Sequence, residues 1–222
     1  MRPIIIVGTG ELAQLAYYYF SHDSSHSVSG FAVDAQFMDS QAKFMGLSVV
    51  SFEEIEALFP PQRFDLFVAI GYSNLNAARA EKCAAAKARG YRLASYISSR
   101  ASVWADLQVG ENCMIMEGIV IQPFVKIGEG VIMFCSSLVS HHVDIGNYCF
   151  VSSEATLCGG VSIGANCFVG ANSTIREHLK VGQSCIIGAG TLIARNVPDG
   201  SGYIEPGTKD SGMPSRRLRS LL

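Results

Sequence analysis

The stretch between Ile97 and Ile193 repeats every six residues, and this period limits the folds that are open to the chain. Each repeat position is aliphatic, without a slip in register: Ile97, Val103, Val109, Ile115, Ile121, Ile127, Met133, Val139, Ile145, Val151, Leu157, Ile163, Val169, Ile175, Val181, Ile187 and Ile193. A second series, four residues after each of these, is small or apolar from Ala101 to Val197. A helix would need a period near ~3.6 and a lone strand a period of ~2. A period of six is typical of the hexapeptide form of parallel β-helix.

Three such hexads close one triangular coil of about 18 residues, so the sequence predicts a stack of between five and six coils. Gly, Asn and Ser gather between the aliphatic positions, as in IGEG at 127–130 and IGNY at 145–148, where very short strands need turns. We expect the aliphatic side chain of each hexad to point into the prism. An ordinary β-sandwich would not keep one register over about 100 residues.

The cysteines are best interpreted on this repeat. Of the seven, four fall in the small core position and are separated by multiples of one coil: Cys113, Cys149, Cys167 and Cys185. Free cysteine packs as a small hydrophobic residue, so we expect one inner column, with Val131 on the remaining rung. Cys83, Cys135 and Cys158 show no metal-ligand spacing. These features predict a reduced, cytoplasmic protein without a metal site.

The net charge of -2 favours neither nucleic acid nor another polyanion as a partner. Met1-Arg2-Pro3 leads straight into IIIVG, which is too short for the apolar part of a signal peptide. No apolar run approaches the roughly 18 residues of a membrane span. We therefore expect neither a leader nor a membrane anchor.

The first part of the chain alternates strand and helix patterns. Apolar runs predict strands at 3–7, 31–34, 49–50 and 66–72, and helical patterns lie between them at 11–20, 52–59 and 76–89. This order is typical of a small Rossmann-like parallel sheet. After Val197 the repeat stops, and a loop at 198–212 and a basic-apolar tail at 214–222 are expected. We thus divide the chain into an α/β domain at 1–96, a β-helix at 97–198 and a tail at 199–222.

Ligands of parallel sheets bind beyond the carboxyl ends of the strands. In this chain those positions are Gly8, Thr9, Gly10, Asp34, Gly71 and Tyr72. The sequence GTGELA at 8–13 fits a loose dinucleotide pattern, so NAD, another phosphate-bearing nucleotide and a purely structural turn are the three alternatives. The region is only half the size of a full dinucleotide fold, and glycines before a helix N-terminus suit a phosphate. A phosphate-bearing nucleotide is therefore favoured.

His141 and His142 fall where a coil turns, and one coil further on the same corner carries Gly159 and Gly160. Imidazole titrates near neutral pH, so a neutral histidine can take the proton of an attacking amine or hydroxyl. Glycine lets a thioester approach closely, and its backbone N–H can stabilise a tetrahedral oxyanion. The constellation predicts acyl transfer; the alternative is a pair of histidines on a solvated surface or a subunit contact. For His178, two coils beyond His142, a surface role is expected.

The whole chain resembles the NeuD/PglD-type sugar acetyltransferases. The resemblance is carried by IIIVGTGELA, LFVAIGY, SHHVDIGNYCFVSSEATLCGGVSIGANCFVGANSTI, IIGAGTLI and GMPSRRL. It implies a left-handed β-helix and a homotrimer that transfers acetyl from acetyl-CoA to an amino or hydroxyl group of a nucleotide-linked deoxysugar in surface-polysaccharide biosynthesis. It also implies that the N-terminal domain holds the nucleotide sugar and that the coenzyme lies between neighbouring β-helices.

By position, the resemblance implies that His141 is the general base, with His142 where the family usually has an acidic partner. It implies coenzyme contacts at Gly159 and its neighbour Gly160, at Ala171 and at Ala189. It also implies nucleotide contacts at Gly8, Gly10, Asp34 and Gly71. Phe134 and Phe150 stand where family members carry polar residues, which suggests a more apolar acceptor pocket or a changed acyl group. Two other functions stay open at this point: a β-helix scaffold that has lost its chemistry, and an acyltransferase with a longer or formyl donor.

Overall fold

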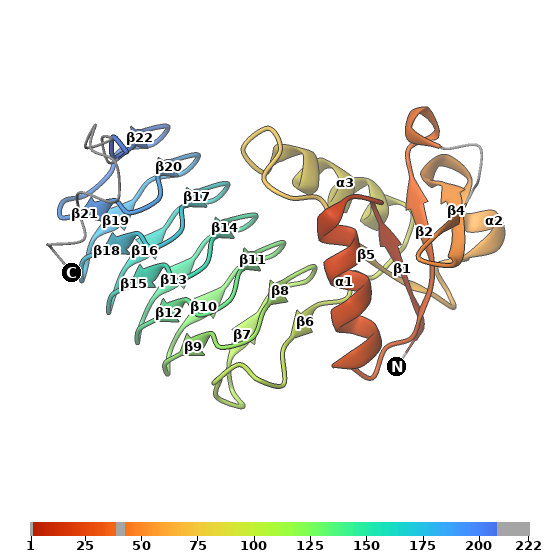
Figure 1. The fold of residues 1–222 in the computed structure, drawn as a ribbon, viewed down its shortest axis with the longest axis horizontal. Coiled ribbons are helices and arrows are strands. Elements are labelled where there is room, and N and C mark those ends of the chain that lie inside the picture. The colour runs from red at the N-terminus through yellow and green to blue at the C-terminus, as the bar shows by residue number, and fades with distance from the viewer. Residues whose placement is uncertain (1, 39–42, 208–222) are drawn as a thin grey trace, which may run out of the picture.

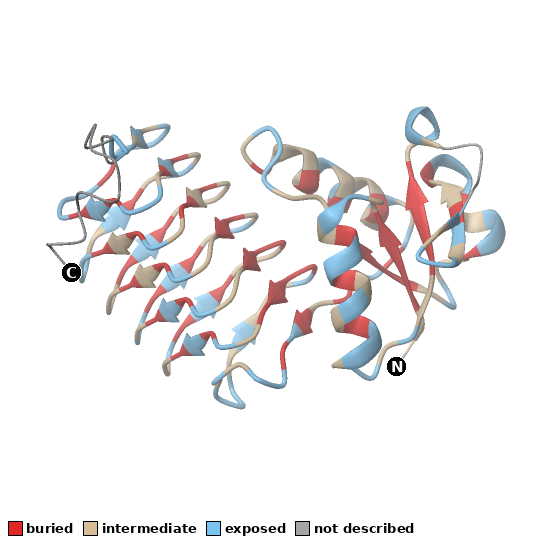
Figure 2. Ribbon diagram, viewed as in Figure 1, coloured by how far each residue is buried: buried red, intermediate tan, exposed pale blue. Residues whose placement is uncertain are grey.

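The computed structural model describes residues 2–38 and 43–207; the predicted tail at 214–222 lies outside this range. The chain folds into a small α/β part followed by a long stack of coils (Figure 1). Buried residues line the strands of the α/β sheet and recur along every coil of the stack (Figure 2). Among the described residues, no helix has the length and hydropathy that a membrane crossing requires.

The N-terminal sheet has five strands in the order β3-β4-β2-β1-β5. Its strands are β1 (Ile4–Val7), β2 (Val28–Val33), β3 (Lys43–Phe44), β4 (Leu47–Ser51) and β5 (Asp65–Val68). Its helices are α1 (Glu11–His22), α2 (Ile55–Leu58) and α3 (Ala77–Ala88), with short 3₁₀ turns at Ala35–Phe37 and Phe52–Glu54. The predicted parallel core is confirmed, because β5, β1, β2 and β4 pair in parallel.

The sheet is nevertheless mixed, because β3 pairs with β4 in the antiparallel direction. The two residues between these strands, Met45 and Gly46, both have positive φ. Two such residues form the tight turn that matches the twist of a hairpin. Strand β3 could not be predicted from the sequence, since two residues are too few to show a period.

The β-helix has three faces, each a sheet of parallel strands of two residues. The first face is β7 (Gln108–Val109), β10 (Lys126–Ile127), β13 (Asp144–Ile145), β16 (Ser162–Ile163) and β19 (Lys180–Val181). The second face is β6 (Tyr96–Ile97), β8 (Met114–Ile115), β11 (Ile132–Met133), β14 (Phe150–Val151), β17 (Phe168–Val169), β20 (Ile186–Ile187) and β22 (Gly202–Tyr203). The third face is β9 (Val120–Ile121), β12 (Leu138–Val139), β15 (Thr156–Leu157), β18 (Thr174–Ile175) and β21 (Leu192–Ile193).

The predicted register holds throughout the stack. Every repeat position from Ile115 to Ile193 is buried, whereas Ile97, Val103 and Val109 are only partly covered. These three lie in the first coils, where no complete coil packs on the outer side. The prediction of a loop at 198–212 is wrong at β22, which lies within that stretch and pairs in parallel with β20.

The turns also follow the period of six. Residues with positive φ recur at the same hexad position: Asn112, Gly118, Phe124, Gly130, Ser136, His142, Tyr148, Glu154, Gly160, Asn166, Asn172, His178, Ser184 and Gly190. Left-handed backbone costs little for Gly and is relatively common for Asn and His, but it is unusual for bulky residues such as Phe124 and Tyr148. The stack imposes this conformation at each of these corners.

The cysteine column is present as predicted. Cys113, Cys149, Cys167 and Cys185 are buried, and all seven cysteines are unpaired. The Cys113 thiol donates to the carbonyl of Gly128 at 3.0 Å, and burial raises the pKa of Cys113 to about 12. The Cys113 thiol therefore stays protonated at neutral pH and acts in packing.

Arg79 of α3 joins the α/β part to the β-helix. The side chain is fully buried, and the guanidinium donates to the carbonyls of Gly130 at 2.8 Å and Tyr148 at 3.1 Å, both on turns between the first and second faces. It also donates to the carbonyls of Ile70 and Gly71 in the α/β part. Burial lowers the pKa of Arg79 to about 10, so the group remains charged at neutral pH.

Asp23, just after α1, makes a second junction. One carboxylate oxygen accepts from the Tyr96 hydroxyl at 2.6 Å, from the Ser98 hydroxyl at 3.0 Å and from the Ser99 N–H at 3.0 Å. Hydrogen bonds from Ser99, Tyr96 and Ser98 hold the pKa of Asp23 well below its usual range. The carboxylate thus fixes the end of α1 to the first coil.

We expect Asp23→Asn to lower the melting temperature at neutral pH. Because the folded-state pKa is depressed, the stabilisation is complete above the usual Asp value of about 4 and is lost as the pH falls below it. The gap between variant and wild type should therefore be widest at neutral pH and narrow at acid pH in thermal unfolding. Glu205→Gln, at an exposed carboxylate, is the control. A gap that widens on acidification would contradict this assignment.

Candidate active site

His141 and His142 lie on the turn between β12 and β13, at the corner where the third face meets the first. Both side chains are exposed, and His142 has a φ of 59°. The two Nδ1 atoms are 3.1 Å apart, so one imidazole donates a hydrogen bond and the other accepts it. If His141 is the donor, its Nε2 keeps a free lone pair.

Gly159 lies directly against the His141 imidazole. A Cβ added at Gly159 would meet His141 Cε1 at 2.6 Å and Nε2 at 2.9 Å. The Gly160 N–H donates to the His141 carbonyl at 2.9 Å, which fixes the two turns one above the other. The predicted stacking of this glycine on a histidine is therefore present.

The second glycine has a different neighbour from the one the sequence analysis implied. A Cβ added at Gly160, which has a φ of 69°, would collide with the imidazole of His178 on the following coil. His178 stays solvent-exposed, in keeping with the surface role expected for it, but its ring also fills the space over Gly160. An imidazole ring thus lies over each glycine of the pair, that of His141 over Gly159 and that of His178 over Gly160.

Two residues on the preceding coil complete the surroundings of the histidine pair. The Gln122 side-chain oxygen accepts from the His141 N–H at 2.9 Å. The ring of Phe124 lies 4.7 Å from that of His142, at an interplanar angle of 38°. The sequence analysis missed both, although stepping back one coil from Ser140 and His142 leads to them.

The Gly159 N–H is a candidate donor to a developing negative charge. Neighbouring N–H groups are used: that of Cys158 donates to Ile175, and that of Gly160 donates to His141. Within the described part of the chain, we find no acceptor for the Gly159 N–H. A free donor next to an imidazole suits a tetrahedral intermediate of acyl transfer.

The four expected coenzyme residues fall on two different edges of the prism. Gly159 and Gly160 share the edge of His141, whereas Ala171 and Ala189 lie on turns between the second and third faces. The third face separates the two pairs within one chain. A single coenzyme can reach both only along this face or between two copies of the chain.

The expected nucleotide residues are brought together in part. Gly8, Thr9 and Asp34 line a hollow of about 680 Å³ at the carboxyl ends of β1 and β2, next to α3. Gly10, Gly71 and Tyr72 do not line it. Gly10 caps α1 instead, and the carbonyl of Gly71 accepts from Arg79.

Further residues of this hollow were not among those predicted from the sequence. Lys82 of α3 forms an ion pair with Asp34, and its ammonium lies 4.3 Å from the ring centroid of Phe52. Phe37 is 67% exposed at the rim. The hollow thus holds the Lys82–Asp34 ion pair and the exposed ring of Phe37, and an exposed aromatic ring suits a nucleobase.

Tyr72 belongs to an aromatic cluster on the second face. Its ring lies 5.0 Å from that of Phe150 and 5.1 Å from that of Phe168. Phe134 extends the cluster at 5.1 Å from Phe150. Phe134 and Phe150, the two positions expected to make the acceptor pocket more apolar, thus lie on a face away from the corner of His141.

In the described residues, no group of three or more His, Cys, Asp or Glu side chains is arranged to hold a metal.

Comparisons with known proteins agree with this architecture. The bacterial transferase hexapeptide family (six repeats) matches residues 142–177 and 160–195. No curated protein sequence matches the chain significantly.

Several solved structures match along almost the whole chain. PerB from Caulobacter crescentus, solved with CoA and GDP-perosamine, has a TM-score of 0.81 and 26% identity, over 95% of this chain and 97% of that one. The acetyltransferase domain of PglB from Neisseria gonorrhoeae FA1090 shares the fold, with a TM-score of 0.81 and 23% identity over 94% and 99%. Its complex with acetyl coenzyme A has a TM-score of 0.80 and 22% identity, over 94% and 98%.

Proposed function

We propose that this chain transfers acetyl from acetyl-CoA to an amino or hydroxyl group of a nucleotide-linked deoxysugar in surface-polysaccharide biosynthesis. The proposal is supported by its hexapeptide repeats and by its likeness in architecture to the NeuD/PglD-type sugar acetyltransferases. The observation that carries the proposal is the packing of the His141 imidazole against Gly159, with His142 bonded to its other side. Among the described residues, neither His141 Nε2 nor the Gly159 N–H has a hydrogen-bond partner.

His141 acts as the general base. The Nδ1–H of His141 donates to His142, and Nε2 takes the proton from the attacking amine or hydroxyl. His142 thus takes the place of the family's acidic partner, because a neutral imidazole nitrogen also accepts a hydrogen bond. Its role is to hold the ring and the tautomer of His141.

The remaining bonds change at the thioester. The nucleophile bonds to the carbonyl carbon, and the oxyanion accepts from the Gly159 N–H. The C–S bond then breaks, and the CoA sulfur leaves with the proton held by His141. The acyl group passes directly between the substrates, so no covalent enzyme intermediate is needed.

Binding roles follow from the hollows and edges described above. Gly8, Thr9 and Asp34, together with Lys82 and Phe37, bind the nucleotide part of the acceptor. Gly159, Gly160, Ala171 and Ala189 contact the coenzyme. Acetyl-CoA as donor and the unpaired cysteines are consistent with a cytoplasmic enzyme.

A homotrimer completes the site in this proposal. Helix α3 packs on the edge between the first and second faces, whereas His141 lies on the edge between the third and first faces. Within one chain, the first face of the β-helix separates the nucleotide hollow from His141. The outward-facing residues of this face are polar: Gln108, Lys126, Asp144, Ser162 and Lys180. The outward row of the third face is less polar and partly exposed: Val120, Leu138, Thr156, Thr174 and Leu192. A neighbouring copy packed on the third face can bring its nucleotide hollow to His141.

The function is tested by incubating the protein with acetyl-CoA and UDP-, dTDP- and GDP-linked amino sugars, with detection of the free CoA thiol. We expect thiol release that depends on one nucleotide series, and CoA alone should raise the melting temperature by mass action. A scaffold would show neither effect. Absence of both would contradict the proposal.

A further inference from the structure

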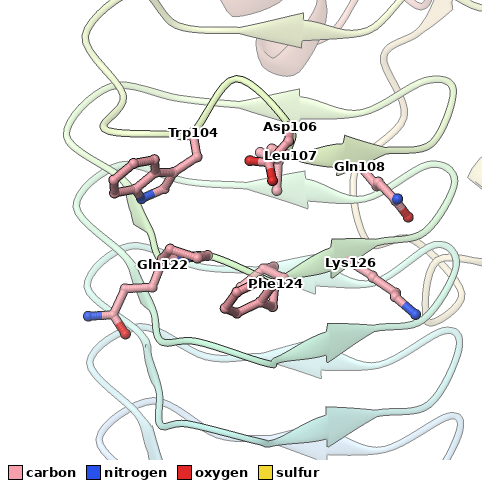
Figure 3. A pocket seen from close by; sticks show the side chains of 9 residues that line it. Trp104, Asp106, Leu107, Gln108, Gln122, Phe124 and Lys126 are labelled. Atoms are coloured by element: carbon pink, nitrogen blue, oxygen red, sulfur yellow. The ribbon is translucent and has the colours of Figure 1, made fainter.

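A second hollow lies at the corner of His141, on the side that faces the α/β part. It measures about 180 Å³ and is lined in part by Trp104 and Asp106 on one coil and by Gln122, Phe124 and Lys126 on the next. Figure 3 shows Trp104 and Asp106 on the upper coil, Gln122 and Phe124 below them, and Lys126 to one side.

Neither histidine lines this hollow, but two of its lining residues contact the histidine pair. Gln122 accepts from the His141 N–H, and Phe124 packs on the ring of His142. Gly159 lies on the other side of His141, one coil further along. A ligand in the hollow and a thioester over Gly159 would therefore approach His141 from opposite ends of the same edge.

The lining combines exposed aromatic rings with polar groups. Trp104 is 60% exposed and Phe124 is 69% exposed, and exposed aromatic rings at a hollow mark a ligand or partner surface. The amide of Gln122, the carboxylate of Asp106 and the ammonium of Lys126 surround them. A pyranose ring has the matching chemistry: C–H faces that pack on aromatic rings and hydroxyls that hydrogen-bond to amides and charged groups.

Size and position select the sugar over the other parts of the substrates. Pockets for whole drug-sized ligands measure roughly 300–1,000 Å³, so this hollow holds one ring and not a coenzyme. The reacting amino or hydroxyl group sits on the sugar ring and must reach hydrogen-bond distance of the base. The nucleobase is separated from that group by the diphosphate, and the larger hollow next to α3 suits it.

We propose that this hollow is the subsite for the acceptor's sugar ring, with Trp104 and Phe124 as its apolar walls and Gln122, Asp106 and Lys126 as hydroxyl partners. The inference rests on the proposed function and adds to it the residues that select the sugar. It also assigns Gln122 a positioning role, because one side chain contacts both the backbone of His141 and the hollow.

Trp104 is the only tryptophan of the chain, so selectively excited tryptophan emission reports on this hollow. The emission should change on titration with the UDP-, dTDP- or GDP-linked amino sugar that is turned over. The parent nucleoside diphosphate and CoA should leave it nearly unchanged. An equal response to the nucleoside diphosphate or to CoA would reassign the hollow and overturn the proposal.

Phe124→Ala supplies a second readout. We expect the KM for the nucleotide sugar to rise about tenfold, because an aromatic contact is lost, while the KM for acetyl-CoA stays unchanged. Tyr18→Ala removes a similarly exposed ring, 59% accessible, from α1 and should change neither value. If a nucleotide sugar is turned over but Trp104 emission and the Phe124→Ala KM do not respond, only the subsite is wrong. If no nucleotide sugar is turned over and none changes the Trp104 emission, the proposed function fails as well.

Discussion

Gly159→Ala is expected to lower kcat about 100-fold while the protein stays folded, because misplacing a catalytic group by about 1 Å costs this much. The new Cβ would stand 2.6 Å from His141 Cε1, so the imidazole must move out of position. The backbone at Gly159 does not have positive φ, so alanine brings no strain of its own. The Gly159 N–H is kept, so the loss reports the clash with the imidazole.

Steady-state kinetics with thiol detection measure this effect. Gly202→Ala is the matched control, since a Cβ there meets nothing within 4 Å. In a His141→Ala background, Gly159→Ala should cause little further loss, because the two residues act through one contact. A single Gly159→Ala variant within threefold of the wild-type kcat would show that this contact does not matter for transfer.

Arg79→Met is expected to cause the largest loss of stability. The side chain is fully buried and donates to five carbonyls: those of Gly130, Tyr148 and Cys149 in the β-helix and those of Ile70 and Gly71 in the α/β part. Methionine fills similar space but leaves these acceptors without their donor. Removing one partner of such a buried charged network costs about 3–5 kcal/mol.

For a chain of this size, that loss corresponds to a fall in melting temperature of roughly 6–20 °C. Thermal unfolding by circular dichroism measures it. Arg176→Met is the control, because its side chain is 55% exposed and its pair with the exposed Glu177 should contribute little. Equal melting temperatures for Arg79→Met and wild type would mean that the junction does not depend on this guanidinium.

The β-helix could be predicted from the sequence because its signal is redundant. Each coil repeats the same pattern of aliphatic and small residues. One irregular position, such as Val131 within the cysteine column, therefore does not hide the register. The register also placed Gly159 one coil above His141, and the structure has that contact. The handedness of the coil came only from the family resemblance, since the period alone does not determine it.

Other features depend on contacts that no local pattern records. Arg79 belongs to an alanine-rich helix and reads as an exposed residue, yet carbonyls of distant turns surround it. His178 was expected on the surface only; its packing on Gly160 depends on which side of the coil its ring takes. Gln122 and Phe124 could have been found, because the repeat places them one coil before Ser140 and His142. The nucleotide hollow needed Lys82, whose pairing with Asp34 joins a helix to a strand end far away in the sequence.

The most direct test of the account is acetyl transfer to a nucleotide-linked amino sugar by His141→Ala, compared with wild type in the thiol-release assay. We predict a fall in kcat of at least about 100-fold, the usual contribution of a general base. The thermal protection given by CoA should be kept, since the imidazole is exposed and the fold does not depend on it. Turnover within about threefold of wild type would contradict the account, because a general base cannot be removed at so small a loss.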